Sequence, residues 1–85
     1  MDEHEIARKA SSLPARFADR IPPTTLKIIS LMDSGGEYGE LTSELAASLA
    51  AHHTPVTTAE RDELLALLEA MGMPTDPIAQ LNVQD

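Results

Sequence analysis

Apolar residues recur along most of this chain with the period of an α-helix. From Asp2 to about Ile21 they follow one another at steps of four, three and four, at Ile6, Ala10, Leu13 and Phe17. Positions at these spacings share one stripe of a helix. Pro14 interrupts the segment, because proline removes a backbone hydrogen bond and clashes with the preceding turn. The pattern therefore predicts either one kinked helix or two short helices, the second beginning at Pro14.

A second helix is predicted from Pro23 to Ser34. The preceding Ile21-Pro22 is expected to be extended, because a residue before proline avoids the helical region, whereas proline is well tolerated in a first turn. Ile28 lies to the side of the predicted buried stripe, where it can touch another helix. Gly35 is expected to be the left-handed residue that closes this helix. The buried positions are expected to be Leu26, Ile29, Leu31 and Met32.

A third helix is predicted from about Glu37 to His52. Its apolar stripe has spacings of three, four and four, and the small residues Thr42 and Ala46 flank it. The linker that follows, residues 53–56, is short, which favours antiparallel packing of the neighbouring helices. The stripe consists of Tyr38, Leu41, Leu45 and Leu49.

The fourth helix has the clearest predicted ends. Thr57 and Glu60 have the spacing of a capping box, and Gly72 is a natural terminator. Asp62 and Glu69 are expected to point outwards, opposite a wide stripe of Leu64, Leu65, Leu67, Leu68 and Met71. Asp76-Pro77 could open one short turn that brings Ile78 and Leu81 onto the core, and residues 82–85 are expected to fray. The expected fold is a single all-α domain over residues 1–85, a small bundle of four main helices with a short C-terminal helical turn.

Composition adds an uneven distribution of charge to this picture. The 85 residues include no cysteine, so packing alone must hold the fold, and the net charge is −8. Residues 1–30 carry five basic and four acidic groups, a net of +1, whereas residues 31–85 carry one basic and ten acidic groups, a net of −9. A negative field of this kind attracts basic protein surfaces and repels nucleic acid and anionic lipid. We therefore expect a basic protein partner, with no direct nucleic-acid or membrane binding.

The N-terminal segment and the hydropathy predict where the protein works. Residues 1–5 are acidic, whereas a secretory signal peptide begins with basic residues. No apolar run approaches the ~20 residues that span a bilayer. These features predict a cytoplasmic protein.

Residues suited to catalysis or metal binding are few. His52 and His53 are consecutive, so on a helix they point about 100° apart and cannot chelate one metal as an i, i+4 pair would. His4 is the only other histidine, and Gly35-Gly36 lacks the later lysine of a phosphate-binding loop. The sequence predicts no enzyme, cofactor or metal site; a pocket that holds His4 beside His52 would be needed to favour catalysis.

A row of carboxylates beside the third stripe is the main candidate for binding. Glu37, Glu40 and Glu44 are spaced three and four residues apart, and Asp33 stands just before the turn. A helix dipole explains acids in a first turn, but not Glu44, which has no basic neighbour one turn away. The row is therefore either a contact for a positively charged partner or a solvated face. Tyr38, the only tyrosine, can serve as an interface anchor, as a core residue, or as both.

Two segments resemble a family of small bacterial immunity proteins, the MafI-type proteins. Gly36-Glu37-Tyr38-Gly39 follows an aliphatic run and Asp33, and the segment from Pro55 to Leu64 leads to Ala70-Met71-Gly72-Met73. The likeness covers roughly residues 21–73. The chain departs from the family pattern in its doubled glycine and in Leu41-Thr42-Ser43-Glu44, where the family more often has alanine and glutamate one step earlier. The resemblance implies binding and neutralisation of a cognate toxin, often a nuclease, whose basic cleft the acidic row would occupy.

Two functions from different classes follow. The first is a non-enzymatic immunity-like inhibitor, with Asp33, Glu37, Glu40 and Glu44 as electrostatic contacts and Tyr38 as an anchor. The second is a structural adaptor, a homodimeric helical module in which Ile28 and the leucines from 64 to 68 form the contact.

Overall fold

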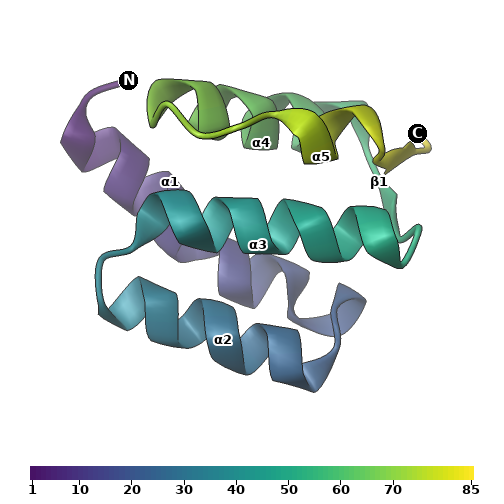
Figure 1. The fold of residues 1–85 in the computed structure, drawn as a ribbon, viewed down its shortest axis with the longest axis horizontal. Helices are drawn as coiled ribbons and strands as arrows, with labels where there is room; N and C mark the ends of the chain where they lie inside the picture. The colour runs from purple at the N-terminus through teal and green to yellow at the C-terminus, as the bar shows by residue number, and fades with distance from the viewer.

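Helix α3 (Tyr38–Ala51) runs through the middle of the molecule and packs against every other long helix. The computed structural model describes residues 1–85 and shows the predicted all-α fold. In Figure 1, α2 (Pro23–Ser34) lies on one side of α3, α4 (Thr58–Ala70) and α5 (Asp76–Ala79) lie on the other, and α1 (Glu3–Phe17) crosses behind. None of the helices combines the length and the apolar character needed to cross a bilayer.

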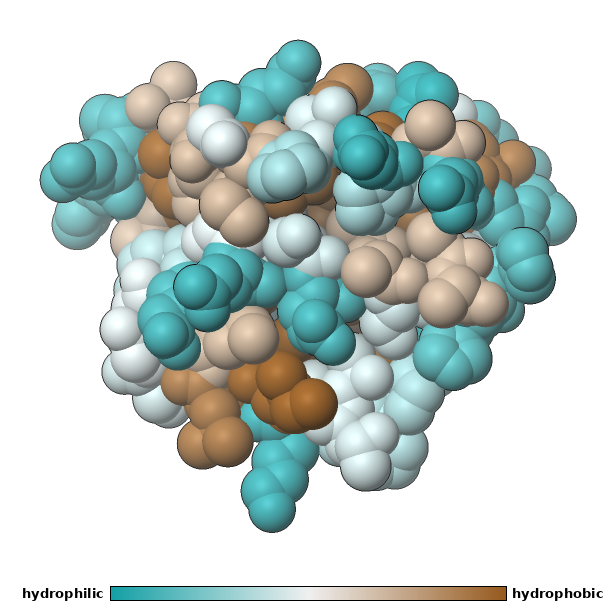
Figure 2. Space-filling model, in the orientation of Figure 1, coloured by the Kyte–Doolittle hydropathy of each residue, from teal (hydrophilic) through white to brown (hydrophobic).

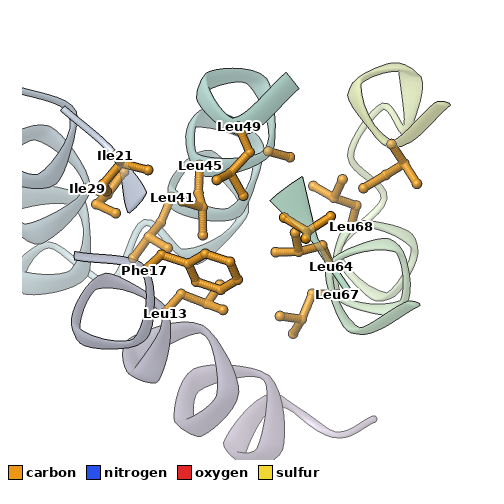
Figure 3. Close-up of a cluster of buried hydrophobic side chains, with 13 residues drawn as sticks. Leu13, Phe17, Ile21, Ile29, Leu41, Leu45, Leu49, Leu64, Leu67 and Leu68 are labelled. Atoms are coloured by element: carbon orange, nitrogen blue, oxygen red, sulfur yellow. The ribbon is translucent and has the colours of Figure 1, made fainter. Parts of the chain in front are cut away.

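The core lies where α1, α3 and α4 face one another (Figure 3). Leu41, Leu45 and Leu49 of α3 are completely buried, as the spacing of three and four residues predicts. Phe17 of α1 packs among them, and Thr42 is buried with its hydroxyl donating to the carbonyl of Tyr38 at 2.9 Å. From α4 the core receives Leu64, Leu67 and Leu68, and from α5 it receives Ile78.

Helix α1 is continuous through Pro14, which decides between the two alternatives that the sequence left open. The helix begins after Asp2, whose carboxylate accepts a hydrogen bond from the Glu5 N–H at 2.8 Å, and it ends at Phe17. Pro14 is buried. A short 3-10 turn, Ala18–Arg20, then leads to the extended Ile21. Burial against the core holds this helix together despite the lost backbone bond.

Helix α2 has the predicted bounds, but two of its apolar residues face outwards. Ile29 is fully buried, whereas Leu31, which we predicted to be buried, is 63% exposed, and Ile28 is 43% exposed. Residues on a helix advance by about 100° each, so Leu31 lies about 200° from Ile29, almost on the opposite side. The prediction for Leu31 is wrong because one face alone can meet the core, and Ile29 with the half-buried Leu26 and Met32 takes that face.

Three helices end with the same hydrogen-bond pattern, in which the N–H groups of two successive residues turn back onto the last turn. After α2, Gly36 donates to Asp33 and Glu37 donates to Met32, at 3.0 and 2.8 Å. This is the Schellman arrangement, with its left-handed residue at Gly36 (φ 70°). Our prediction of a left-handed Gly35 is wrong by one residue, because Gly35 keeps a right-handed helical conformation. Gly72 after α4 (φ 67°) and His53 after α3 (φ 51°) play the same part.

Ion pairs join the end of α1 to the start of α4. Arg20 donates hydrogen bonds from Nη1 and Nη2 to the two oxygens of the Glu60 carboxylate, at 2.9 and 2.6 Å. Arg16, about one turn before Arg20, pairs with Glu63 of α4. Glu60 also accepts from the Thr57 N–H, which completes the predicted capping box. Arg20 lies over the Phe17 ring, with 4.3 Å from its Cζ to the ring centroid. The first turn of α4 is therefore fixed both by its own cap and by α1.

The C-terminal residues are ordered, in contrast to our expectation that they fray. Asn82–Val83 (β2) pairs in parallel with Pro55–Val56 (β1), and the Gln84 N–H donates to the carbonyl of Val56 at 2.8 Å. The Asp85 carboxylate accepts hydrogen bonds from the N–H and the hydroxyl of Thr58 at the start of α4. The tail is held because the Val56 carbonyl and the first N–H groups of α4 need partners. The predicted helical turn of α5 precedes it, with Ile78 buried and Leu81 against the core.

Candidate acidic and apolar face of the α2–α3 hairpin

The predicted carboxylates of α3 lie at the surface without intramolecular ion pairs. Glu37 and Glu40 are exposed and Glu44 is half-buried, and no basic group approaches any of them within 4.0 Å. Glu37 occupies the position just before α3, where its side chain makes no capping hydrogen bond. Neither a cap nor a salt bridge therefore accounts for these three side chains.

Asp33 is in a different situation from the other predicted contacts. It is half-buried, and its carboxylate accepts a hydrogen bond from the Ser11 hydroxyl of α1. One of its oxygens thus serves packing between α1 and α2. Asp33 therefore joins α2 to α1, and it is less available to a partner than the carboxylates of α3.

The direction in which the row faces follows from its neighbour Gly39. A Cβ added at Gly39 would lie 3.1 Å from Met73 Sδ, so this side of α3 packs against the segment that follows α4. Glu40 and Glu44 are rotated by about 100° and about 140° from Gly39 around the helix. They therefore face away from α4 and toward the side on which α2 lies.

Exposed apolar side chains lie on α2 beside this row. Figure 2 shows a brown, hydrophobic patch over α2, directly below hydrophilic surface over α3. The large exposed apolar residues of α2 are Ile28 and Leu31, one helical turn apart. We call Ile28, Leu31, Glu40 and Glu44 the acidic–apolar face. Sequence reasoning placed Ile28 off the buried stripe but missed Leu31, which the 100° rule applied to Ile29 would have placed off the core.

Most of the chain's basic residues form ion pairs away from α3. Four of the six form ion pairs, and all four partners lie on α1 or α4: Lys9 with Glu5, Arg16 with Glu63, Arg20 with Glu60 and Arg61 with Asp62. Hydrogen bonds from Arg20 lower the pKa of Glu60 to about 2, and the same bonds raise the pKa of Arg20. Thus Glu60 and Glu63 of α4 are joined to Arg20 and Arg16 at the end of α1 and the turn after it, whereas the acids of α3 form no ion pair.

Tyr38 lines a surface cavity instead of extending the acidic–apolar face. It is half-buried at the first position of α3, and its hydroxyl makes no hydrogen bond within the chain. The cavity has a volume of about 540 Å³ and is enclosed by the beginnings of α1 and α3 and the end of α4. No histidine lines this cavity or the second one, which lies between α3 and α5. His4 and His52 do not meet in either cavity.

Comparisons with models of protein families, with curated proteins and with solved structures found no match for this chain.

Proposed function

We propose that this protein is a non-enzymatic, immunity-like inhibitor that binds a basic protein partner through the acidic–apolar face. The observation that carries the proposal is the pairing of unmatched carboxylates with exposed apolar residues on neighbouring helices. Glu40 and Glu44 have no intramolecular cation, and Leu31 is 63% exposed one turn from Ile28. The helix dipole favours Glu40 in the first turn of α3, but it does not account for Glu44 or for the exposed apolar pair.

The apolar half would provide affinity. Full burial of a leucine or isoleucine side chain contributes roughly 1.5–3 kcal/mol. Scaled by the exposed fractions of 43% and 63%, Ile28 and Leu31 would together contribute about 2 kcal/mol on docking. An apolar centre with charged residues at its edge is the usual arrangement of a specific protein interface.

The acidic half would provide speed and selectivity. Carboxylates that face solvent attract a positively charged surface over the Debye length of about 10 Å and raise the association rate. Residues 31–85 have one basic residue against ten acidic ones, so the net field stays negative although Lys27 of α2 adjoins Ile28. A nuclease has to present a basic cleft to phosphate, and the carboxylates could occupy that cleft in place of the phosphates. The resemblance of residues 21–73 to MafI-type immunity proteins supports this class of partner.

The test begins with capture of partners on the purified chain, followed by measured affinities for the one identified. Wild type is compared with a Glu40→Lys/Glu44→Lys double variant and with Leu31→Ser, in a salt series. The matched control is Asp19→Lys/Glu69→Lys, which changes net charge equally at two exposed acids that have no ion pair.

We expect the first two variants to lose at least tenfold in affinity, about 1.4 kcal/mol, and the control to lose much less. Rising salt should slow association. Equal losses in the double variant and the control would show that only net charge matters. A partner whose binding is unaffected by Leu31→Ser and by salt would refute the proposed face.

The alternative, a homodimeric adaptor, is supported only by Ile28 and its neighbour Leu31. Leu64, Leu67 and Leu68 are buried in the core, so the contact that we predicted through these leucines is wrong. A symmetric dimer about the exposed pair would also bring the carboxylates of α3 near their own copies, which opposes association. Sedimentation equilibrium distinguishes the two functions: the inhibitor is expected to be a monomer, and a concentration-independent dimer would favour the adaptor.

A further inference from the structure

Three helix ends enclose the cavity that Tyr38 lines. The first turns of α1 and α3 and the last turn of α4 meet at the same end of the molecule (Figure 1). The volume of about 540 Å³ is within the range of roughly 300–1,000 Å³ that small-ligand pockets have. Ile6, Gly39 and Met71 provide apolar walls, and Tyr38 provides the only aromatic ring. The lining therefore offers apolar contacts beside one aromatic ring.

The charges around the cavity determine which kind of group it favours. Glu3 is the only charged residue in the lining, and no basic side chain reaches it. Glu37 and Glu40 adjoin lining residues in the chain. Two helix N-termini each contribute about +0.5 charge and one C-terminus about −0.5, a sum near +0.5. The single carboxylate of the lining already exceeds this sum, so the cavity favours a cation even though α3 begins without a side-chain cap.

We infer that this cavity receives a long cationic side chain of the partner, with arginine favoured over lysine. The inference rests on the proposed function, because it names a group through which a basic partner would be anchored at the end of the molecule where α3 begins. The methylene stem lies along Ile6 and Met71, as long cationic side chains do on apolar surfaces. The guanidinium pairs with Glu3 and meets Tyr38, whose ring attracts a cation and whose hydroxyl is free to accept a hydrogen bond.

The experiment uses the whole chain and needs no partner. The ¹⁵N-labelled protein is titrated with N-acetyl-arginine amide, with its neutral isostere N-acetyl-citrulline amide and with N-acetyl-leucine amide, and the amide shifts are followed by NMR. We expect saturable shifts at Gly36, Gly39 and Ala70 with arginine, at a dissociation constant on the order of 1 mM. Citrulline should bind at least several-fold more weakly. Added salt should weaken the arginine complex.

Two variants test the role of Glu3. Glu3→Gln should weaken arginine binding by about two- to fivefold, the value of an exposed charge pair, and Asp19→Asn, beyond the other end of α1, should leave it unchanged. Both residues are exposed, so neither substitution should unfold the chain.

The inference is overturned by shifts confined to α3 around Glu44, by equal binding of leucine or citrulline, or by no saturable binding. Each of these outcomes leaves the proposed function standing if the partner still requires Glu40, Glu44 and Leu31. Conversely, arginine binding in the cavity without a salt-sensitive partner would support this inference and refute the proposed function.

Discussion

The bidentate ion pair between Arg20 and Glu60 should make stability depend on pH in a way that one substitution removes. The pair ties the turn after α1 to the first turn of α4, at 2.9 and 2.6 Å. Hydrogen bonds from Arg20 are the largest of the causes that lower the pKa of Glu60 from 4.5 to about 2. Glu60→Gln is the perturbation of choice, because glutamine keeps one oxygen for the capping box and removes the charge and the second acceptor of the ion pair.

The magnitude follows from the pKa and from exposure. A fall from 4.5 to about 2 corresponds to about 3 kcal/mol at full value, since one pKa unit is about 1.4 kcal/mol. The side chains of Arg20 and Glu60 are still 31% and 17% exposed, so solvent screens part of the interaction. We therefore expect Glu60→Gln to lower the free energy of unfolding by about 1–2 kcal/mol at pH 7.

The sign with pH is fixed because the folded-state pKa lies below the unfolded-state value. The contribution is complete above about pH 5 and is lost as the pH falls through 4.5 to below 2, where both states bind the proton. Urea unfolding followed by far-UV circular dichroism at about pH 7, 4 and 2 measures the difference in free energy of unfolding between wild type and variant. This difference should shrink toward the lowest pH.

The control is Glu63→Gln, which removes the neighbouring pair with Arg16. That pair contributes no capping bond and its side chains are 40% and 31% exposed, so a loss of less than about 1 kcal/mol is expected. A difference for Glu60→Gln below about 0.5 kcal/mol at pH 7, or one that stays constant to pH 2, would refute the reasoning.

Three further predictions concern the helix ends, the acidic row and the C-terminus. His53→Gly should raise the free energy of unfolding by about 0.5–1 kcal/mol, because a left-handed position at the end of a helix favours glycine. Gly36→Ala should lower the free energy of unfolding by about the same 0.5–1 kcal/mol. Urea unfolding that shows the opposite signs would contradict this reasoning. Glu44→Gln should leave stability unchanged or raise it by about 0.2–0.5 kcal/mol, since it relieves repulsion one turn from Glu40; a clear loss in the same assay would mean that Glu44 serves the fold. Hydrogen bonds from Thr58 lower the pKa of Asp85, which shows that they favour its charged form. Asp85→Asn should therefore speed amide hydrogen exchange in β2, because the charged acceptor at the start of α4 is lost. Unchanged exchange in β2 would show that the strand pairing alone holds this segment.

Local patterns in the sequence determined most of the helical architecture. The steps of three and four residues at Leu41, Leu45 and Leu49 predict a buried stripe, and all three are fully buried. Thr57 and Glu60 predict a capping box, and both of its hydrogen bonds are present. Such features can be read from the chain because each depends on residues within about one or two helical turns.

The acidic half of the candidate face and the position of Ile28 off the buried stripe were also readable from the sequence, whereas the exposure of Leu31 was not. The spacing of Glu37, Glu40 and Glu44 places them together on α3 whatever the helix packs against. Leu31 is exposed because another face of α2 packs against the core. Since α2 has apolar residues on several sides, its sequence does not determine which face is buried.

Only the tertiary structure decided how distant segments meet. The strand Asn82–Val83 is too short to show a pattern, and it forms because the chain returns to Val56, whose carbonyl accepts from Gln84. Likewise, Arg16 and Arg20 meet Glu63 and Glu60 across 47 and 40 residues of sequence. Local sequence sets the backbone conformation of each helix, whereas pairing across the fold depends on which surfaces the buried leucines bring together. Ion pairs join four of the six basic residues to acids of α1 and α4, and the carboxylates of α3 form no ion pair.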